Sequence, residues 1–301
     1  MKNEYNNTNN KKMEEIMGYR IGFDIGSTTI KAVVLDENNQ ICYKSYERHK
    51  AQVRQKALDK LVELKKYTKE PFKFAISGSG ALGLSEQGEL PFVQEVFASA
   101  TGVSKLYPET DCAIELGGED AKILFFQGSV EQRMNSTCAG GTGAFIDQMA
   151  TLLNMSLEEM NEASLNYHRL YPIASRCGVF AKTDIQPLIN QGVDKCDLCA
   201  SIFQAVVDQT ITSLAQGRKI EGNILFLGGP LYFMSGLRNR FVETLKLSDV
   251  QVNCPDTAIN FVALGTAICA NQEYTYDELY KVLEDLVHAP AKLTESKPLF
   301  E

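Results

Sequence analysis

The chain has 301 residues, of which 44% are hydrophobic, and a formal net charge of −8. This length predicts about two domains with an ordinary buried core, and the negative charge argues against nucleic acid or an anionic membrane as the main partner. No apolar run approaches the roughly 20 residues that span a bilayer. The N-terminus has no apolar signal core, so we expect a cytoplasmic protein.

The first glycine turn follows a polar leader. Residues 1–18 are rich in Asn, Lys and Glu and are predicted to be disordered. Within residues 20–34, an apolar strand carries Asp24, an aliphatic residue and Gly26, and a second apolar strand follows. Such runs bounded by glycine indicate two strands joined by a tight turn. The turn adds hydroxyl groups and a lysine, namely Ser27, Thr28, Thr29 and Lys31.

The chain between the first and second turns has ordinary α/β patterning. We expect strands over 41–47 and 72–76 and helices over 51–67 and 91–103. Residues 78–83 match the dinucleotide pattern G-x-G-x-x-G. Gly88 and Pro91 interrupt the helix that this motif requires, so we interpret residues 78–83 as a flexible surface loop.

The second glycine turn, within residues 111–126, repeats the layout of the first. Glu115 precedes the adjacent glycines Gly117 and Gly118, and Glu119 and Asp120 follow them. Paired glycines let a backbone approach a ligand with its amides exposed, and carboxylates beside such a turn imply Mg²⁺. The alternative is a plain hairpin with a solvated acidic tip. Two such units indicate a duplicated core that holds one polyphosphate from both sides.

These turns suggest roles for individual residues. The sequence lacks G-x-x-x-x-G-K-[ST], which excludes a P-loop enzyme. Asp24 and Asp120 are placed to hold Mg²⁺, and Glu115 to orient the attacking water. We therefore assign catalysis to Asp24, Glu115 and Asp120. Nucleotide binding is assigned to the turn residues Gly26, Ser27, Thr28, Thr29, Lys31, Gly117, Gly118 and Glu119.

The rest of the chain alternates between strands and helices. Strands are expected over 128–134, over 222–227 and near residue 250. One helix is expected to follow the glycine-rich loop and to end near residue 153, and another is expected to begin at residue 156. Further helices are expected over 183–190, 194–216, 236–245, 257–270 and 276–287. Two stretches at strand–helix junctions offer bare surfaces for an adenosine, namely Gly140, Gly141, Thr142 and Gly143, and Gly228, Gly229 and Pro230. This order predicts an α/β fold of two related lobes, residues 19–130 and 131–290, with 291–301 as a linker or tail.

The eight cysteines, without a signal peptide, favour free thiols or metal ligation over disulfides. Cys196 and Cys199 form C-x-x-C at an apparent helix start, which fits either structural thiols or a metal or redox pair. Cys138 and Cys177 lie beside Gly and Ser/Thr residues near predicted helix N-termini, a setting that suits a thiolate-bound cluster. A cubane takes four thiolates, which a two-fold dimer would supply. The alternative is two unrelated thiols in turns.

These residues resemble the BadF/BadG/BcrA/BcrD ATPases, activators of 2-hydroxyacyl-CoA dehydratases and benzoyl-CoA reductases in the actin/Hsp70/sugar-kinase superfamily. The resemblance covers about residues 20–270 and rests on FDIGSTTIK, ELGGEDAK, NSTCAGGTGAFIDQMA, SRCGVFAKTD and FLGGP. It implies the actin-like (ribonuclease H-like) ATPase fold with a nucleotide cleft between the lobes. It also implies ATP and Mg²⁺ as cofactors and a homodimer that bridges one [4Fe-4S] cluster through Cys138 and Cys177.

The resemblance implies ATP hydrolysis coupled to delivery of a low-potential electron, with ferredoxin or flavodoxin as the donor. Glu115 and Glu119 replace an Asp and a Gln of the shorter activators, and this version is similar to large fused activases. The acceptor is therefore expected to be a dehydratase-like or a double-cubane iron–sulfur protein. The alternatives are a small-molecule kinase of the same superfamily and a nucleotide-gated scaffold.

Overall fold

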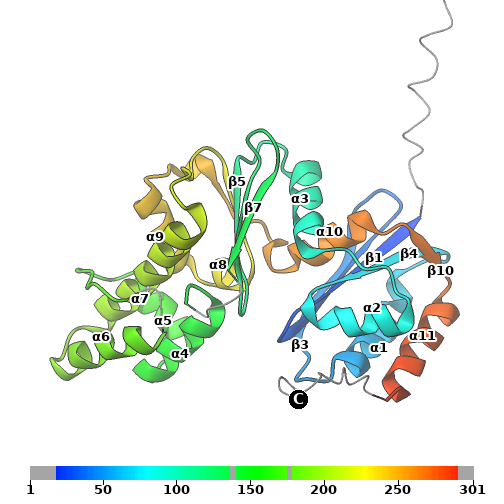
Figure 1. The fold of residues 1–301 in the computed structure, drawn as a ribbon, viewed down its shortest axis with the longest axis horizontal. Helices are drawn as coiled ribbons and strands as arrows, with labels where there is room; N and C mark the ends of the chain where they lie inside the picture. The colour runs from blue at the N-terminus through cyan, green and yellow to red at the C-terminus, as the bar shows by residue number, and fades with distance from the viewer. Residues whose placement is uncertain (1–17, 136–139, 175–177, 291–301) are drawn as a thin grey trace, which may run out of the picture.

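The computed structural model describes residues 18–135, 140–174 and 178–290. The predicted tail, nearly all of the predicted leader, and both Cys138 and Cys177 lie outside these residues. The described chain forms two α/β lobes that stand side by side (Figure 1). Each lobe is built on one five-stranded mixed sheet.

The first sheet has the strand order β10-β4-β1-β2-β3. Its strands are β1 (Tyr19–Ile25), β2 (Thr29–Leu35), β3 (Ile41–Arg48), β4 (Phe72–Ser77) and β10 (Gln272–Tyr274). The antiparallel β1–β2–β3 meander is extended by β4, which runs parallel to β1. Three helices pack on one face of this sheet, namely α1 (Val53–Leu64), α2 (Leu82–Gly88) and α11 (Tyr276–His288). Helix α10 (Phe261–Cys269) covers the other face, so both sides of β1, β2 and β4 are buried and these strands are nearly continuous apolar runs.

The second sheet has the order β7-β6-β5-β8-β9 and repeats the first in its pairing. Its strands are β5 (Cys112–Leu116), β6 (Ala121–Phe125), β7 (Glu131–Asn135), β8 (Ile224–Leu227) and β9 (Val252–Asn253). The β5–β6–β7 meander is antiparallel, and β8 runs parallel to β5. The helices of this lobe are α4 (Gly143–Leu153), α5 (Leu157–Ser164), α6 (Gly178–Asn190), α7 (Lys195–Thr210), α8 (Gly229–Phe233) and α9 (Ser235–Leu245). The duplicated core that the two glycine turns predicted is thus a real repeat, with β1–β4 matching β5–β8.

The chain crosses between the lobes twice. It leaves the first lobe through α3 (Glu95–Leu106), builds the second sheet, and returns through α10 (Phe261–Cys269) to β10 and α11. The division between the sheets therefore differs from the lobe boundary expected near residue 130, because β5 and β6 pair with β7 and β8. The expected C-terminal lobe likewise gives up its last strand and helix to the first lobe.

The two crossing helices lie between the sheets in direct backbone contact (Figure 1). A Cβ atom on Gly265 of α10 would lie 2.1 Å from the Ala98 carbonyl oxygen of α3. On its other side, α10 packs on β1, where a Cβ atom on Gly22 would lie 2.2 Å from the Ala263 carbonyl oxygen. Only glycine permits approaches this close.

Three local predictions differ from the structure. Residues 78–83 are not a flexible loop, because a 3₁₀ turn at Ser79–Ala81 leads straight into α2. The helix expected from residue 91 begins at Glu95, because the preceding residues pair with β4, with the Ile76 N–H donating to the Pro91 carbonyl at 2.9 Å. The helix expected from residue 183 begins at Gly178.

Helix α7 and the π-helical turn that follows it form the core of the second lobe. The segment Lys195–Ala215 is long and apolar enough to cross a membrane by length and composition. However, 72% of its apolar window is buried inside the protein. Its apolar character is explained by packing in this lobe, since Leu198, Ile202 and Phe203 are in the core.

Candidate nucleotide site

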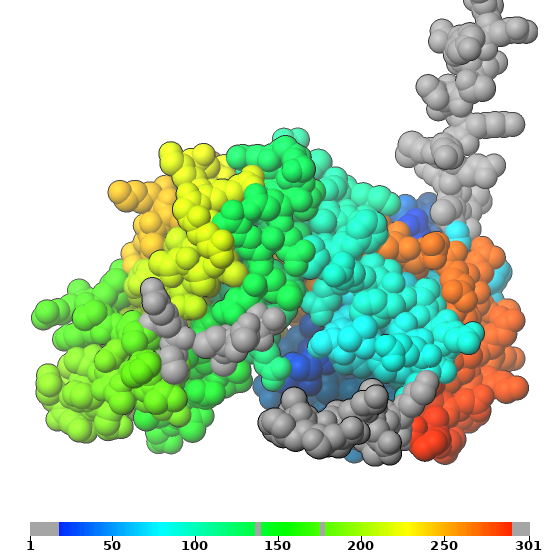
Figure 2. Space-filling model, in the orientation of Figure 1, coloured from blue at the N-terminus to red at the C-terminus, as the bar shows by residue number. Residues whose placement is uncertain are grey.

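The two glycine turns face each other between the lobes. The first turn closes with the Gly26 N–H donating to the Thr29 carbonyl at 2.9 Å, and the second with the Gly117 N–H donating to the Asp120 carbonyl at 2.8 Å. A Cβ atom on Gly118 would lie 3.4 Å from Thr28 Oγ1, so the tips of the turns are adjacent. Figure 2 shows the surface indented between the two lobes. The structure thus brings together the residues predicted to hold phosphates, and their contact with phosphate stays a prediction.

The first turn carries exposed hydroxyls above a buried ion pair. Ser27 and Thr28 are exposed, whereas Asp24 is 3% exposed and its Oδ2 lies 2.7 Å from Lys31 Nζ. Burial lowers the pKa of the Lys31 ammonium, but the charge of Asp24 and its hydrogen bond outweigh burial, so the pKa is raised. Lys31 is therefore a fixed positive charge, and Thr29 is buried beneath the turn.

The second turn lies above a larger buried charge cluster. Lys122 is directly opposite Glu115 in the strand register, as Lys31 is opposite Asp24 in the first lobe. Lys122 is 2% exposed, and its ammonium lies 2.7 Å from Asp120, 3.6 Å from Glu115 and 2.5 Å from Glu95 of α3. Three carboxylates thus share one cation. Glu119 is exposed at the tip of the turn, and its carboxylate is not one of these three.

The Glu115 carboxyl is buried and lies among other charged groups. Burial raises the pKa of its carboxyl above the ordinary value, Lys122 opposes this, and the charges of Asp120 and Glu95 add to the increase. The Ser99 hydroxyl of α3 donates to Glu115 Oε2 at 3.3 Å and holds the carboxyl in place. A carboxylate whose pKa is raised toward neutrality accepts a proton more readily, which fits the predicted role of Glu115 toward water.

The N-terminus of α4 is bonded to the back of the second turn. The Gly143 N–H donates to the Gly117 carbonyl at 3.0 Å, and the Ala144 N–H donates to the Gly118 carbonyl at 2.8 Å. Two amides that have no partner within their own helix are satisfied in this way. Gly140, Gly141 and Thr142 are buried ahead of the helix, which differs from the bare surface expected there. The second turn and the start of α4 are therefore bonded directly to each other.

The junction after β8 forms a wall beside the second turn. Gly228 has a φ of +86°, and a Cβ atom there would lie 2.0 Å from the Leu116 carbonyl oxygen. Pro230 Cγ would lie 3.3 Å from a Cβ atom on Gly143. The junction after β4 repeats this arrangement, since Gly78 has a φ of +97° and abuts Ile25. Residues 228–230 are half-buried, and their contact with adenosine stays a prediction.

Substitution of Gly228 by alanine is expected to lower the free energy of unfolding by about 3 kcal/mol. The new Cβ atom meets backbone rather than a flexible side chain, and the left-handed conformation adds strain. Urea-induced unfolding followed by circular dichroism measures the change.

Gly83→Ala is the matched control. Gly83 lies in α2, and a Cβ atom there would meet nothing within 4 Å. This change should raise the stability by about 0.5–1 kcal/mol. Equal effects of the two substitutions would contradict the close approach at Gly228.

Comparison with known proteins identifies the family. The family model described as "BadF/BadG/BcrA/BcrD ATPase family" matches residues 21–270, most of the chain. The chain belongs to the BadF/BadG/BcrA/BcrD ATPase family. This confirms the resemblance noted from the sequence motifs.

Individual members of the BadF/BadG/BcrA/BcrD family are similar over nearly their whole length. The 2-hydroxyisocaproyl-CoA dehydratase activator of Clostridioides difficile is 27% identical over 86% of this chain and 96% of its own. The (R)-2-hydroxyglutaryl-CoA dehydratase activating ATPase of Acidaminococcus fermentans is 28% identical over 84% of this chain and 96% of its own length. The solved structure of the activator of the 2-hydroxyisocaproyl-CoA dehydratase from Clostridium difficile, with bound ADPNP, has a TM-score of 0.73 at 26% identity. The match covers 90% of this chain and 98% of that chain. The predicted fold class, two related lobes of the actin-like ATPase fold, is confirmed.

The predicted cluster ligands of this ATPase, Cys138 and Cys177, lie outside the described residues, but the helices that follow them are in contact. Gly178 directly follows Cys177, and a Cβ atom on it would lie 3.2 Å from Gln148 Oε1 and 3.7 Å from Phe145 Cδ2. Both of these residues belong to α4, which begins five residues after Cys138. The starts of α6 and α4 are therefore packed together.

The C-x-x-C pair lies at the start of α7, in surroundings that favour the neutral thiol. Cys199 is fully buried, with its Sγ 3.9 Å from Met155 Sδ, and burial raises the pKa of its thiol to about 12. Burial also raises the pKa of the Cys196 thiol, and Asp194 adds to the increase. Reactive thiols have a lowered pKa. Within the described residues, no group of three or more His, Cys, Asp or Glu side chains is arranged to hold a metal ion.

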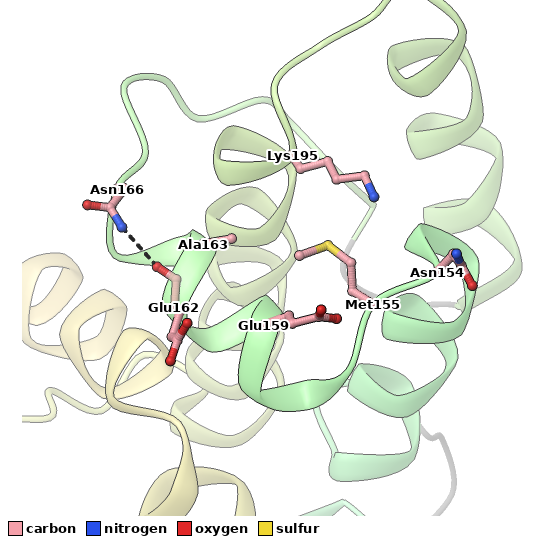
Figure 3. Close-up of a pocket in the computed structure, with 7 residues that line it drawn as sticks. All are labelled: Asn154, Met155, Glu159, Glu162, Ala163, Asn166 and Lys195. Carbon is pink, nitrogen blue, oxygen red and sulfur yellow. Dashed lines mark hydrogen bonds between the residues drawn. The ribbon is translucent and has the colours of Figure 1, made fainter.

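A separate hollow lies at the far end of the second lobe. It has a volume of about 370 Å³ and lies between the C-terminus of α4, helix α5 and the start of α7 (Figure 3). Its polar groups include Glu159, Glu162 and Lys195, whose ammonium donates to the Leu153 carbonyl at 3.2 Å. No residue of either glycine turn lines it. It is therefore distinct from the nucleotide site.

Four residues that lie at the site were not predicted to belong to it from the sequence. Gly78 abuts the first turn, and Glu95 and Lys122 form the charge cluster behind the second. The fourth, His49, is 4% exposed and its Nε2 lies 3.1 Å from the Gly26 carbonyl oxygen. Lys122 could have been found, because it occupies the position in the second repeat that Lys31 occupies in the first.

Proposed function

We propose that this chain hydrolyses ATP between its lobes and uses the cycle to deliver a low-potential electron from a shared [4Fe-4S] cluster. The acceptor would be a 2-hydroxyacyl-CoA dehydratase-like or double-cubane protein, and the donor a ferredoxin or flavodoxin. The naming of several relatives as dehydratase activators supports the partner class. The ADPNP-bound activator structure supports nucleotide binding.

The observation that carries the coupling is the bonding of α4 to the second turn. The two N-terminal amides of α4 bind the carbonyls of Gly117 and Gly118. A phosphate held at this turn would therefore move α4, and α4 contacts the start of α6 at Gly178. These helices begin next to the segments that contain Cys138 and Cys177. Such coupling requires that the nucleotide site and the electron-transfer site both act on one structural element that has two states.

The proposed function requires two further groups, Mg²⁺ and the [4Fe-4S] cluster. Mg²⁺ usually takes one or two carboxylates together with substrate phosphates, and Asp24 and Asp120 stand beside the two turns. Cys138 and Cys177 would supply two thiolates per chain, so a cluster of four thiolates would need a homodimer. When bound, Mg²⁺ would neutralise phosphate charge, and the cluster would supply a one-electron carrier.

The remaining steps belong to the side chains of the protein. Amides and hydroxyls of the first turn and amides of the second would bind the phosphates from both sides. Glu115, fixed by Ser99, would orient the attacking water and accept its proton as ATP becomes ADP and phosphate. Lys31 is a fixed charge beside the first turn, where charge develops on the phosphates.

Iron analysis of the protein purified without oxygen tests this function. Wild type is expected to hold about four iron and four sulfide per two chains and to run as a dimer. Cys138→Ala and Cys177→Ala are expected to lose the iron and its brown colour. Cys196→Ala is the matched control and should keep both. Full iron content in either of the first two variants would refute the ligand assignment.

A further inference from the structure

His49 is bonded to the first phosphate turn through both its ring and its backbone. It follows β3 and is 4% exposed. Its Nδ1 accepts the Ala51 N–H at 3.2 Å, so the ring hydrogen is on Nε2. The Nε2–H group therefore donates to the Gly26 carbonyl, 3.1 Å away. The backbone N–H of His49 donates to the Thr28 carbonyl at 3.2 Å.

The backbone after His49 takes an unusual path to make these bonds. Lys50 and Ala51 are consecutive non-glycine residues with φ values of +49° and +61°. Left-handed conformations are unfavourable for such residues and persist where the surroundings fix them. Here the left-handed pair turns the chain back, so that the Ala51 N–H reaches the ring of His49.

The second turn shows what these bonds accomplish. There the carbonyls of Gly117 and Gly118 are bound from behind by the amides of α4. In the first lobe, the ring of His49 binds the Gly26 carbonyl and its backbone N–H binds the Thr28 carbonyl. A carbonyl oxygen repels a phosphate oxygen, whereas an amide N–H attracts it. A carbonyl held by His49 is not free to turn toward a bound phosphate, which favours the N–H side of the peptide unit for an anion.

We propose that His49 is a positioning residue of the nucleotide site. It fixes the Gly26 and Thr28 carbonyls, so that the first turn presents N–H groups to the phosphates of ATP. This inference rests on the nucleotide-binding part of the proposed function and needs no iron–sulfur cluster. Its ligand is the polyphosphate chain rather than the adenosine.

Binding of ADP and adenosine to variants at position 49 tests the assignment. His49→Phe keeps a ring of similar shape but removes the donor to Gly26, and its affinity for ADP should fall about tenfold. Its affinity for adenosine should stay within about twofold of wild type. Competition against a fluorescent ATP analogue measures both ligands. His288→Phe, at an exposed histidine in the last turn of α11, is the matched control and should change neither.

Conservative variants separate positioning from packing. The amide of glutamine can reach the place of Nε2, so His49→Gln should recover most of the ADP affinity, whereas the shorter His49→Asn should not. This pair remains decisive if His49→Phe does not fold. Equal ADP affinity of the Gln and Asn variants, or a parallel loss of ADP and adenosine in His49→Phe, overturns the inference. If the wild type itself binds no nucleotide, the proposed function fails instead.

Discussion

Substitution of Asp24 by asparagine should lower the rate of ATP hydrolysis at least about a hundredfold at saturating Mg²⁺ and ATP. The change removes the carboxylate predicted to hold Mg²⁺ at the first turn and leaves the shape of the side chain nearly unchanged. It also leaves Lys31 without its partner at 2.7 Å, which alters the charge beside the phosphates. Phosphate release in the steady state measures the effect.

Asp36→Asn provides the control for this experiment. Asp36 lies just after β2, at the far end of the same hairpin, where its Oδ1 accepts the Asn38 and Gln40 N–H groups at 2.8 Å. An asparagine oxygen can accept both bonds, so hydrolysis should stay near the wild-type rate. Hydrolysis by Asp24→Asn within tenfold of wild type would remove Asp24 from the catalytic set.

Substitution of Lys122 by methionine should lower the free energy of unfolding by about 3–5 kcal/mol. Lys122 is 2% exposed, and its ammonium is shared by the carboxylates of Glu95, Glu115 and Asp120. Methionine fills a similar volume but leaves these negative charges without a counter-ion. Urea-induced unfolding gives the change in stability.

The loss in Lys122→Met should also depend on pH. Lys122 opposes the increase in the pKa of Glu115, so its removal raises that pKa further. A carboxyl whose pKa is raised in the folded state binds more protons there than in the unfolded state, and stability therefore falls as pH rises. The deficit should be larger at pH 8 than at pH 5.5. Lys105→Met, at an exposed position of α3, should show neither effect, and an equal deficit at both pH values would argue against unpaired carboxylates as the cause.

The glycine turns were predictable because their signal is local. In each, an acid, an aliphatic residue and a glycine stand between two apolar runs, and Gly26 and Gly117 take the same hydrogen bond in the structure. The repetition of this pattern in one chain pointed to a duplicated core before any fold was known. The family motifs around Cys138 and Cys177 were equally local.

What the sequence did not show depends on contacts between distant residues. Strand β10 has only three residues, Gln272–Tyr274, and pairs with β4 about 200 positions earlier, so no periodicity marks it. The burial of Gly140–Thr142 and of His49 is set by the elements around them. Gly78 and Gly228 have equivalent places, each at the end of a strand that lies beside a glycine turn. This equivalence depends on the pairing of distant strands, so the sequence around Gly78 indicates only a loop.

The double passage of the chain through α3 and α10 limits how the two halves of the molecule can move. A protein joined by one linker can twist and swing in any direction. Here two covalent connections run side by side, and their backbones touch at Ala98 and Gly265. Two connections at one place allow the lobes less freedom than a single linker would, and we expect any relative rotation to be centred near this contact.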